Sequence, residues 1–212
     1  MVNMRAENFF TEAEKDRIHQ AVIDAETRTS GEIVPMMVSS SARYTEVELS
    51  TLIAGLFIGA LAGWLWDHPW GSPYFYLWPV IGATAGFLLG RIPAVKRRLV
   101  SANRIAEAVD DQCLAEFTRN NLHYTREHTG ILIFVSLLEH QVEVLADRGI
   151  AEKVAPGTWD EIVRILTAGL KSGKACDAFC KAIERCGEIL ATHFPRQDDD
   201  RDELPNKLVT DR

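Results

Sequence analysis

Two apolar stretches without a charged residue constrain this chain more than any other feature of its sequence. They read TLIAGLFIGALAGWLW over residues 51–66 and YFYLWPVIGATAGFLLG over residues 74–90. A helix needs about 17 residues or more to cross the hydrocarbon core of a bilayer, so we expect spans at residues 50–66 and 73–90. With the tight turn at residues 67–71, they predict a transmembrane hairpin of two helices. The alternative, a buried helical pair in a soluble core, is disfavoured because the remaining chain is too small to cover both helices.

The flanks of the two stretches predict an orientation. Aromatic side chains gather at the turn, as in the aromatic belts at membrane interfaces: Trp64, Trp66, Trp70, Tyr74, Tyr76 and Trp78. Positive charges follow the second stretch: Arg91, Lys96, Arg97 and Arg98. Cytoplasmic flanks carry the excess of Lys and Arg. We therefore expect an integral protein of the inner membrane with both termini in the cytoplasm.

Small residues recur at every fourth position of both stretches. They are Gly55, Gly59 and Gly63 in the first and Gly82, Gly86 and Gly90 in the second. Glycines at this spacing form a flat stripe that lets two helices approach closely. The spacing predicts that the two spans pack through these stripes, and an intermolecular dimer through the same residues is the alternative.

The sequence on both sides of the two apolar stretches predicts one α/β domain. Helical periodicity appears over residues 10–27, 98–119, 158–170 and 174–193, and Thr11 with Glu14 forms a capping box. Strands are expected over residues 32–38, 131–137 and 142–146, where β-branched and apolar residues cluster. A strand–helix–strand unit followed by a hairpin predicts a small mixed β-sheet, with a parallel pair and an antiparallel neighbour, sandwiched by helices.

This interpretation divides the chain into three parts. Residues 1–44 and 96–195 form a discontinuous cytoplasmic α/β domain, residues 45–95 form the inserted transmembrane hairpin, and residues 196–212 form a charged C-terminal tail. The formal net charge of −7 argues against nucleic acid as a partner. The lipid bilayer is the expected partner, together with another membrane protein or a second copy of the chain.

Three sequence stretches resemble the TPM domain family. They are TSGEIV at residues 29–34, TGILIFVS at residues 129–136 and EHQVEVLADRGI at residues 139–150, and the third is the most specific. Trp159 and ELPN at residues 203–206 resemble a bacterial membrane-anchored branch of that family. The resemblance covers most of the chain outside residues 45–95, and it implies a sheet sandwiched by helices.

The family includes thylakoid proteins linked to photosystem II repair, for which acid phosphatase activity and calcium binding are known, and animal members that assist receptor channels. For this chain the resemblance leaves two functions open. The favoured one is a membrane-tethered, non-catalytic interaction or accessory module, because no complete catalytic set is visible. The alternative is a divalent-metal-dependent, acid phosphatase-like enzyme.

The predicted strand directions bring a few polar residues to one end of the sheet. Glu32 opens the first strand, Thr129 precedes the second, and Asp147 and Arg148 follow the antiparallel third strand. Glu32 and Asp147 are therefore candidate ligands of a hard cation such as Ca²⁺, and Arg148 and Thr129 are candidate partners of a phosphate or carboxylate. The alternative is a salt-bridged sheet edge in which Asp147 caps the next turn.

The cysteines offer a weaker possibility. Cys176 and Cys180 are four positions apart on a predicted helix and could share a metal ion, whereas Cys113 and Cys186 lie elsewhere. No Cys-x-x-Cys pair is present. The preferred interpretation is small apolar packing residues in a reducing compartment.

Overall fold

The computed structural model describes residues 5–66, 74–125, 127–155, 157–196, 204 and 206–210. The turn predicted at residues 67–71 and most of the tail predicted at residues 196–212 lie outside these residues. The chain divides into two compact units. One comprises Met1–Ser41 with Ala108–Arg212, and the other comprises Ala42–Glu107.

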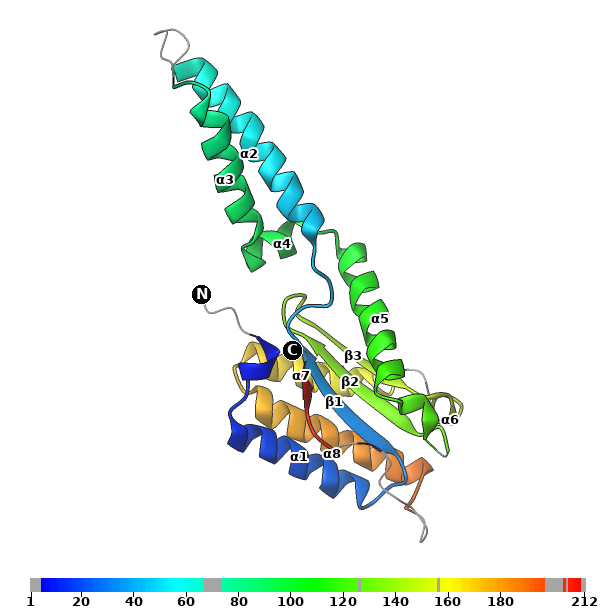
Figure 1. Ribbon diagram of the computed structural model, residues 1–212. Helices are drawn as coiled ribbons and strands as arrows, with labels where there is room; N and C mark the ends of the chain where they lie inside the picture. Colours follow the sequence, from blue (N-terminus) through cyan, green and yellow to red (C-terminus); the bar gives the residue numbers. More distant parts are fainter. Residues whose placement is uncertain are drawn as a thin grey trace. The chain divides into compact units, whose positions relative to one another are not determined.

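The first unit is built on a mixed sheet of four strands in the order β3-β2-β1-β4 (Figure 1). Its strands are β1 (Glu32–Val38), β2 (Gly130–Ser136), β3 (Gln141–Ala146) and β4 (Val209–Thr210). β1 and β2 are parallel, and β3 runs antiparallel to β2. These pairings confirm the predicted mixed sheet. The two-residue β4, parallel to β1, was not predicted.

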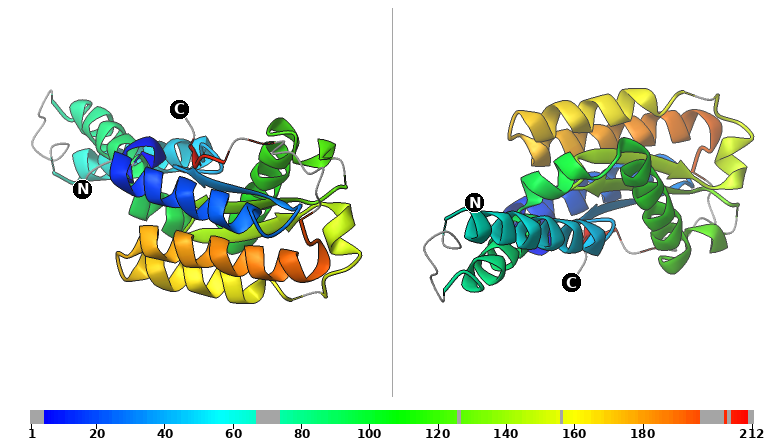
Figure 2. Two further views of the ribbon diagram at one scale, coloured as in Figure 1. Left: turned by 90° about the horizontal axis from the view of Figure 1, so that it is seen from below. Right: turned by 90° about the horizontal axis from the view of Figure 1, so that it is seen from above.

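Helices cover both faces of this sheet (Figure 2). The helices α1 (Glu12–Glu26), α7 (Asp160–Lys171) and α8 (Ala175–His193) pack on one face, where their apolar side chains meet Ile33, Ile131 and Ile133. On the other face, Val109, Cys113 and Phe117 of α5 (Ala102–Arg119) meet Leu132 and Phe134. Both faces of β1 and β2 are therefore buried, which explains their almost continuous apolar sequence.

The structure corrects the prediction of one continuous helix over residues 98–119. Two helices are present, α4 (Pro93–Leu99) and α5 (Ala102–Arg119), and Val100 has an extended backbone between them. Pro93 at the first helical position gives α4 its own beginning, because proline is pre-organised there and its missing N–H is not needed.

The second unit contains α2 (Thr45–Trp66) and α3 (Leu77–Gly90), which pack against each other (Figure 1). Glycines line their contact. A Cβ added at Gly55 would meet the carbonyl oxygen of Gly82 at 2.2 Å, and one at Gly86 would meet that of Thr51 at 2.1 Å. The prediction that the two helices pack through their glycine stripes is confirmed.

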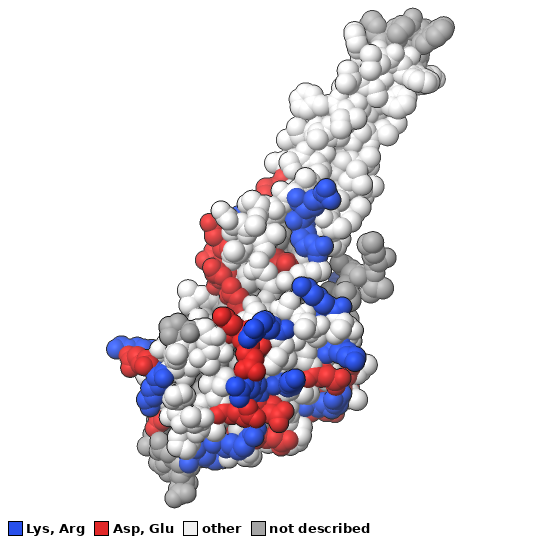
Figure 3. Space-filling view, turned by 180° about the vertical axis from the view of Figure 1, so that it is seen from behind, with Lys and Arg blue, Asp and Glu red and all other residues white. Residues whose placement is uncertain are grey.

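Among the described residues, α2 is long and apolar enough to cross a membrane by itself. α3 meets the same criterion only together with α4, and the two are bent by 87° where they join. Composition and length thus identify one possible membrane-spanning helix. The space-filling view shows that the surface formed by the α2–α3 pair carries almost no Lys, Arg, Asp or Glu (Figure 3).

Candidate functional site

The residues predicted to form a cation site lie at one end of the sheet. Glu32 pairs with Gly130 in the parallel ladder, and the backbone N–H of Asp147 donates to the carbonyl of Gly130 over 2.9 Å. Glu32, Gly130 and Asp147 therefore form one row across three strands. Because neighbouring strands lie about 4.8 Å apart, the outer two residues of this row are separated by about 10 Å at their Cα atoms.

Leu122 lies against Gly130, the middle residue of this row. A Cβ added at Gly130 would meet the Leu122 carbonyl oxygen at 2.5 Å and the Leu122 Cβ at 3.0 Å. Leu122 itself is fully buried at the start of a short 3-10 helix, Leu122–Tyr124. Glycine at position 130 thus lets the Leu122 backbone cover the middle of the row.

Asp147 uses both of its carboxylate oxygens locally. Oδ1 accepts a hydrogen bond from the backbone N–H of Arg148 and caps α6 (Arg148–Ala151). Oδ2 lies 3.2 Å from Nδ1 of His128, a residue held in the left-handed backbone region at φ 54°. This cap matches the alternative to a metal site, in which Asp147 caps the turn after the third strand.

Arg148 and Thr129 also have partners of their own. The Arg148 guanidinium donates to Glu152 over 2.8 Å on the exposed surface, which raises the pKa of Arg148, and it makes no hydrogen bond to Asp147. The Thr129 hydroxyl donates to the carbonyl of Ser30 and is almost completely buried. The described residues contain no group of three or more His, Cys, Asp or Glu side chains that could hold a metal ion. Calcium binding at Glu32 and Asp147 stays a prediction.

A second polar cluster closes the opposite end of the sheet, where β1 and β2 finish. Glu139, in the turn between β2 and β3, accepts hydrogen bonds from the hydroxyl of Ser136, the hydroxyl of Ser40 and the backbone N–H of Ser41. The Ser41 hydroxyl in turn donates to that of Ser136 over 3.0 Å. Open α/β sheets often bind ligands at this edge. Here Ser136 and Glu139 are buried, so the hydroxyl and the carboxylate bind each other and are closed to a substrate.

A third cluster lies between α5 and β3 and was not predicted. Burial and a hydrogen bond with Asp110 raise the pKa of Glu143 to about 7, and the neighbouring negative charge of Asp110 adds to the shift. Burial, with the charge of Glu143, raises the pKa of the Cys113 thiol to about 12. A carboxyl group with a pKa raised in this way can exchange a proton near neutral pH. Glu143 alternates with Val142 and Val144 along β3, so its side chain lies on the other face of the strand. The sequence alone does not show that Asp110 lies beside it.

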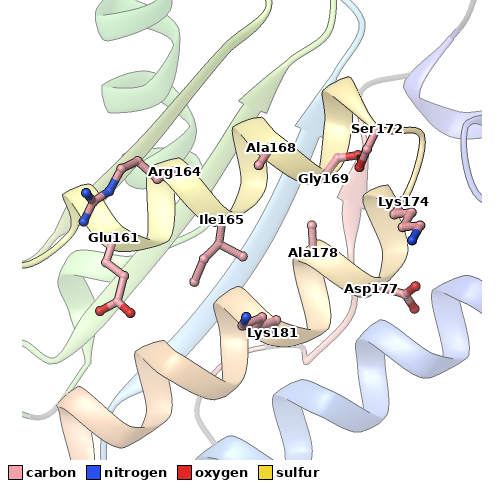
Figure 4. A pocket seen from close by; sticks show the side chains of 10 residues that line it. All are labelled: Glu161, Arg164, Ile165, Ala168, Gly169, Ser172, Lys174, Asp177, Ala178 and Lys181. Carbon is pink, nitrogen blue, oxygen red and sulfur yellow. Dashed lines mark hydrogen bonds between the residues drawn. The ribbon is translucent and has the colours of Figure 1, made fainter.

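The outer side of the helical layer carries an open groove of about 510 Å³ between α7 and α8 (Figure 4). Ile165, Ala168 and Ala178 provide apolar lining. The two acids of the lining are paired with arginines, Glu161 with Arg185 at 3.0 Å and Asp177 with Arg17 at 2.8 Å. The remaining charged side chains of the lining are basic: Arg164, Lys174 and Lys181. This groove has the features of a contact surface and holds no nucleophile–base pair.

The cysteines serve in packing. Cys113, Cys176 and Cys186 are buried and all four thiols are free. The thiols of Cys176 and Cys180 donate to the backbone carbonyls of Glu14 and Arg17 at 3.7 and 3.8 Å. Burial raises the pKa of both thiols, which disfavours the thiolate that a metal site needs.

The comparisons with known proteins inform the fold alone. The chain is similar to the BA42 protein from the psychrophilic bacterium Bizionia argentinensis, solved by NMR, with a TM-score of 0.62 and 21% sequence identity. The alignment covers 98% of this chain and 99% of that one. No protein-family model and no curated protein matches the chain.

Proposed function

We propose that this chain is a membrane-tethered TPM-domain protein that serves as a non-catalytic interaction or accessory module of a bacterial membrane complex. In this proposal, residues 50–66 and 73–90 form two spans of the inner membrane. Both termini, and the α/β unit with them, face the cytoplasm.

The observation that carries the membrane proposal is the exposure of apolar side chains along α2 and α3. Only 11% of the most apolar 18-residue window of α2 is buried. Phe57, Ile58 and Leu65 of α2 are each more than 60% exposed, and Val80 and Ile81 of α3 are about equally exposed. A core helix of a soluble protein would bury most of this surface. An exposed surface of this size and composition is stable in hydrocarbon and unstable in water.

Membrane extraction tests insertion, and cysteine labelling tests orientation. The protein should stay in the membrane pellet in alkaline carbonate and leave it only in detergent. A Ser72→Cys variant should react with a membrane-impermeant maleimide in intact spheroplasts, whereas the parent protein, with its four native cysteines, should not. Residue 72 lies outside the described residues, between the predicted turn at residues 67–71 and the predicted second span at residues 73–90. Release of the protein by carbonate would contradict insertion. Labelling at position 72 only after permeabilisation would reverse the orientation.

The assignment to the TPM family rests on the position of the resembling stretches. Residues 29–34 contain the beginning of β1, residues 129–136 contain β2, and residues 139–150 contain β3 and continue into α6, so these three stretches fall on one sheet and its turns. The inserted segment separates β1 from β2 in sequence and lies outside the resemblance.

The polar clusters of the α/β unit support a non-catalytic function. Each candidate nucleophile or base described above is bonded to another protein group or buried, and a catalytic base must reach its substrate. The α7–α8 groove offers an apolar floor for a partner. Chemical crosslinking in native membranes, followed by purification in detergent, is the direct test. A single defined adduct would support a membrane-protein partner, and an adduct of twice the mass would identify a homo-oligomer.

The alternative function is a divalent-metal-dependent phosphatase with Glu32 and Asp147 as metal ligands. The observation in its favour is the shared row of these two carboxylates at the end of the sheet. Hydrolysis of p-nitrophenyl phosphate by the purified protein, with Ca²⁺ and with chelator, tests it. Activity that needs Ca²⁺ and disappears in Asp147→Asn would replace the accessory role with an enzymatic one.

A further inference from the structure

The groove between α7 and α8 exists because small residues bring these two helices close together. A Cβ added at Gly169 of α7 would lie 2.1 Å from the Cβ of Ala178 of α8. Residues 172–174 join the helices directly, as in an antiparallel helical hairpin, so this contact lies near the joined end of the pair. The short side chains leave a hollow over the contact, and Ile165 and Ala168 complete its apolar lining (Figure 4).

The acidic side chains of the groove are already paired within the protein. Asp177 pairs with Arg17 of α1 at 2.8 Å, and Glu161 pairs with Arg185 of α8 at 3.0 Å. Arg185 also binds Glu188 at 2.7 Å and thus bridges two carboxylates along the same side of the helices. Both acids of the described lining therefore have a cationic partner of their own.

Three cations of the same groove have no acidic partner among the described residues. The side chains of Arg164, Lys174 and Lys181 are exposed and make no hydrogen bond or ion pair with any residue that the structure describes. Arg164 and Lys181 lie on opposite walls, and Lys174 lies toward the end where the helices are joined (Figure 4). The whole chain has a formal net charge of −7, so these cations reverse its charge locally. Their arrangement around one hollow favours an anionic ligand.

The walls of the groove favour a helical ligand over an extended strand. A strand binds by adding its backbone hydrogen bonds to an open sheet edge. The backbone groups in the middle of α7 and α8 are used within each helix, so a strand would gain no backbone pairing here. An amphipathic helix needs only an apolar surface for its own apolar side chains. From Arg164 to Ser172 the groove follows eight positions of α7, or about 12 Å, which matches about two turns of a partner helix.

We propose that the α7–α8 groove binds an acidic amphipathic helix of a partner protein. The apolar side chains of that helix lie on the apolar lining, and carboxylates on both sides of its apolar stripe pair with Arg164, Lys174 and Lys181. This inference rests on the proposed accessory function and names the chemical class of the partner. Neither a flat bilayer surface nor a nucleic acid presents an apolar stripe between two rows of anions, so neither fits this groove as well.

A synthetic peptide tests this inference on the full chain in lipid nanodiscs, with empty nanodiscs as the background. The probe is a fluorescent helical peptide with leucines at positions i, i+3, i+4 and i+7 and glutamates on both sides of this stripe. Fluorescence anisotropy measures its dissociation constant. We expect a value on the order of 10⁻⁵ M, because two turns of helix bury less surface than a standard interface. A peptide with glutamine in place of each glutamate should bind about tenfold more weakly, since exposed ion pairs contribute modestly.

Charge variants of the chain locate the site. The triple variant Arg164→Gln, Lys174→Gln, Lys181→Gln should bind the glutamate peptide about tenfold more weakly than the parent and should lose its salt dependence. Its affinity for the glutamine peptide should equal that of the parent. The matched control removes the same charge from exposed positions outside the groove: Arg28→Gln, Arg196→Gln and Lys207→Gln. This control should bind the glutamate peptide like the parent.

A shape variant separates the apolar lining from the charges. Ala168 is exposed on the groove side of α7, so Ala168→Trp fills the hollow without removing a charge or a buried contact. This variant should block the binding of both peptides and should melt at the temperature of the parent. Retained binding in Ala168→Trp would show that the peptide lies elsewhere and would overturn the inference.

Four further results would overturn the inference. They are no binding of the glutamate peptide to the parent, equal binding of the two peptides, unchanged binding in the triple variant, and displacement of the peptide by single-stranded DNA that binds the parent more tightly. The last would identify a general polyanion site. Crosslinking in native membranes separates these failures from a failure of the accessory function. An adduct that forms equally in the parent and the triple variant refutes only the groove, whereas the absence of any adduct in the parent contradicts the accessory function.

Discussion

Nδ1 of His128 lies 3.2 Å from Oδ2 of Asp147, and this imidazole occupies the direction from which a cation would approach the carboxylate. The side chain of Asp147 is 11% exposed, and that of His128 is 60% exposed. A cation at this position would therefore have to displace the histidine, which can swing into solvent.

Calcium should bind this end of the sheet weakly. A site with two protein carboxylates keeps several waters, so we predict a dissociation constant on the order of 10⁻⁴ to 10⁻³ M. Calcium should raise the melting temperature of the parent in detergent, and more so in His128→Ala, where the competing imidazole is removed. The double variant Glu32→Gln, Asp147→Asn should lose the increase. If calcium stabilises the double variant as much as the parent, the ion binds elsewhere and the phosphatase alternative loses its structural support.

Stability should depend on pH through Glu143. An unfolded glutamate has a pKa of about 4.3, whereas burial and the hydrogen bond with Asp110 raise the pKa of Glu143 to about 7 in the folded protein. The folded state therefore binds the extra proton between these values. The resulting stability is fully present below the unfolded pKa and is lost as pH rises through about 7.

Urea unfolding at several pH values between about 5 and 8 measures this effect. The free energy of unfolding of Glu143→Gln should change less over this range than that of the parent. The exposed Glu152→Gln is the control and should retain the pH dependence of the parent. A parent protein that is more stable at the upper end of the range would contradict the assignment.

The glycine contact between α2 and α3 should be intolerant of larger side chains. A Cβ at Gly82 would lie 2.1 Å from the carbonyl oxygen of Gly55, which is backbone and cannot rotate away. Gly82→Ala gains about 1 kcal/mol of helix propensity but forces the helices apart, and overpacking costs about 1–3 kcal/mol. Gly86→Leu should be worse. Ala85→Leu, at an exposed position of the same helix, is the control for thermal stability in detergent, and equal melting temperatures for the two leucine variants would refute the contact.

The buried carboxylate of Glu139 should contribute strongly to stability. Glu139→Ala leaves the Ser136 hydroxyl and the Ser41 backbone N–H without their acceptor, at a cost of about 2–4 kcal/mol. Glu152→Ala, which breaks an exposed ion pair with Arg148, should cost much less, because solvent screens this pair. Chemical denaturation of both variants compares the two. Similar losses would mean that the turn network is open to water.

Short-range sequence patterns were enough to predict several elements of the fold. Alternation, apolar runs and residue spacing predicted the strands β1, β2 and β3, the capping box of Thr11 and Glu14, and the glycine contact between α2 and α3. The break between α4 and α5 at Val100 was not predicted, because apolar and basic residues continue across it with helical spacing. β4 was not predicted, because its two residues are a strand only through their parallel pairing with Met36 and Met37.

The candidate site, too, could be predicted only where short-range sequence patterns were enough. Strand direction was enough to align Glu32 with Asp147, but it could not reveal that Leu122 packs against Gly130 in the same row. The pairing of Glu143 with Asp110 depends on which helix covers β3 and on the rotation of that helix. Both facts belong to the tertiary packing, for which a single sequence carries no local pattern.

The parallel pairing of β1 with β2 also sets the order of events during synthesis. Residue 32 pairs with residue 130, which is 98 positions later. At translation rates of about 5–20 residues per second, β1 leaves the ribosome roughly 5 to 20 s before its central neighbour exists. The apolar helices emerge in this interval. The unpaired strand EIVPMMV is therefore open to aggregation during this interval. Under the proposed membrane insertion, the newly made chain would depend on chaperones and on prompt delivery of the intervening segment.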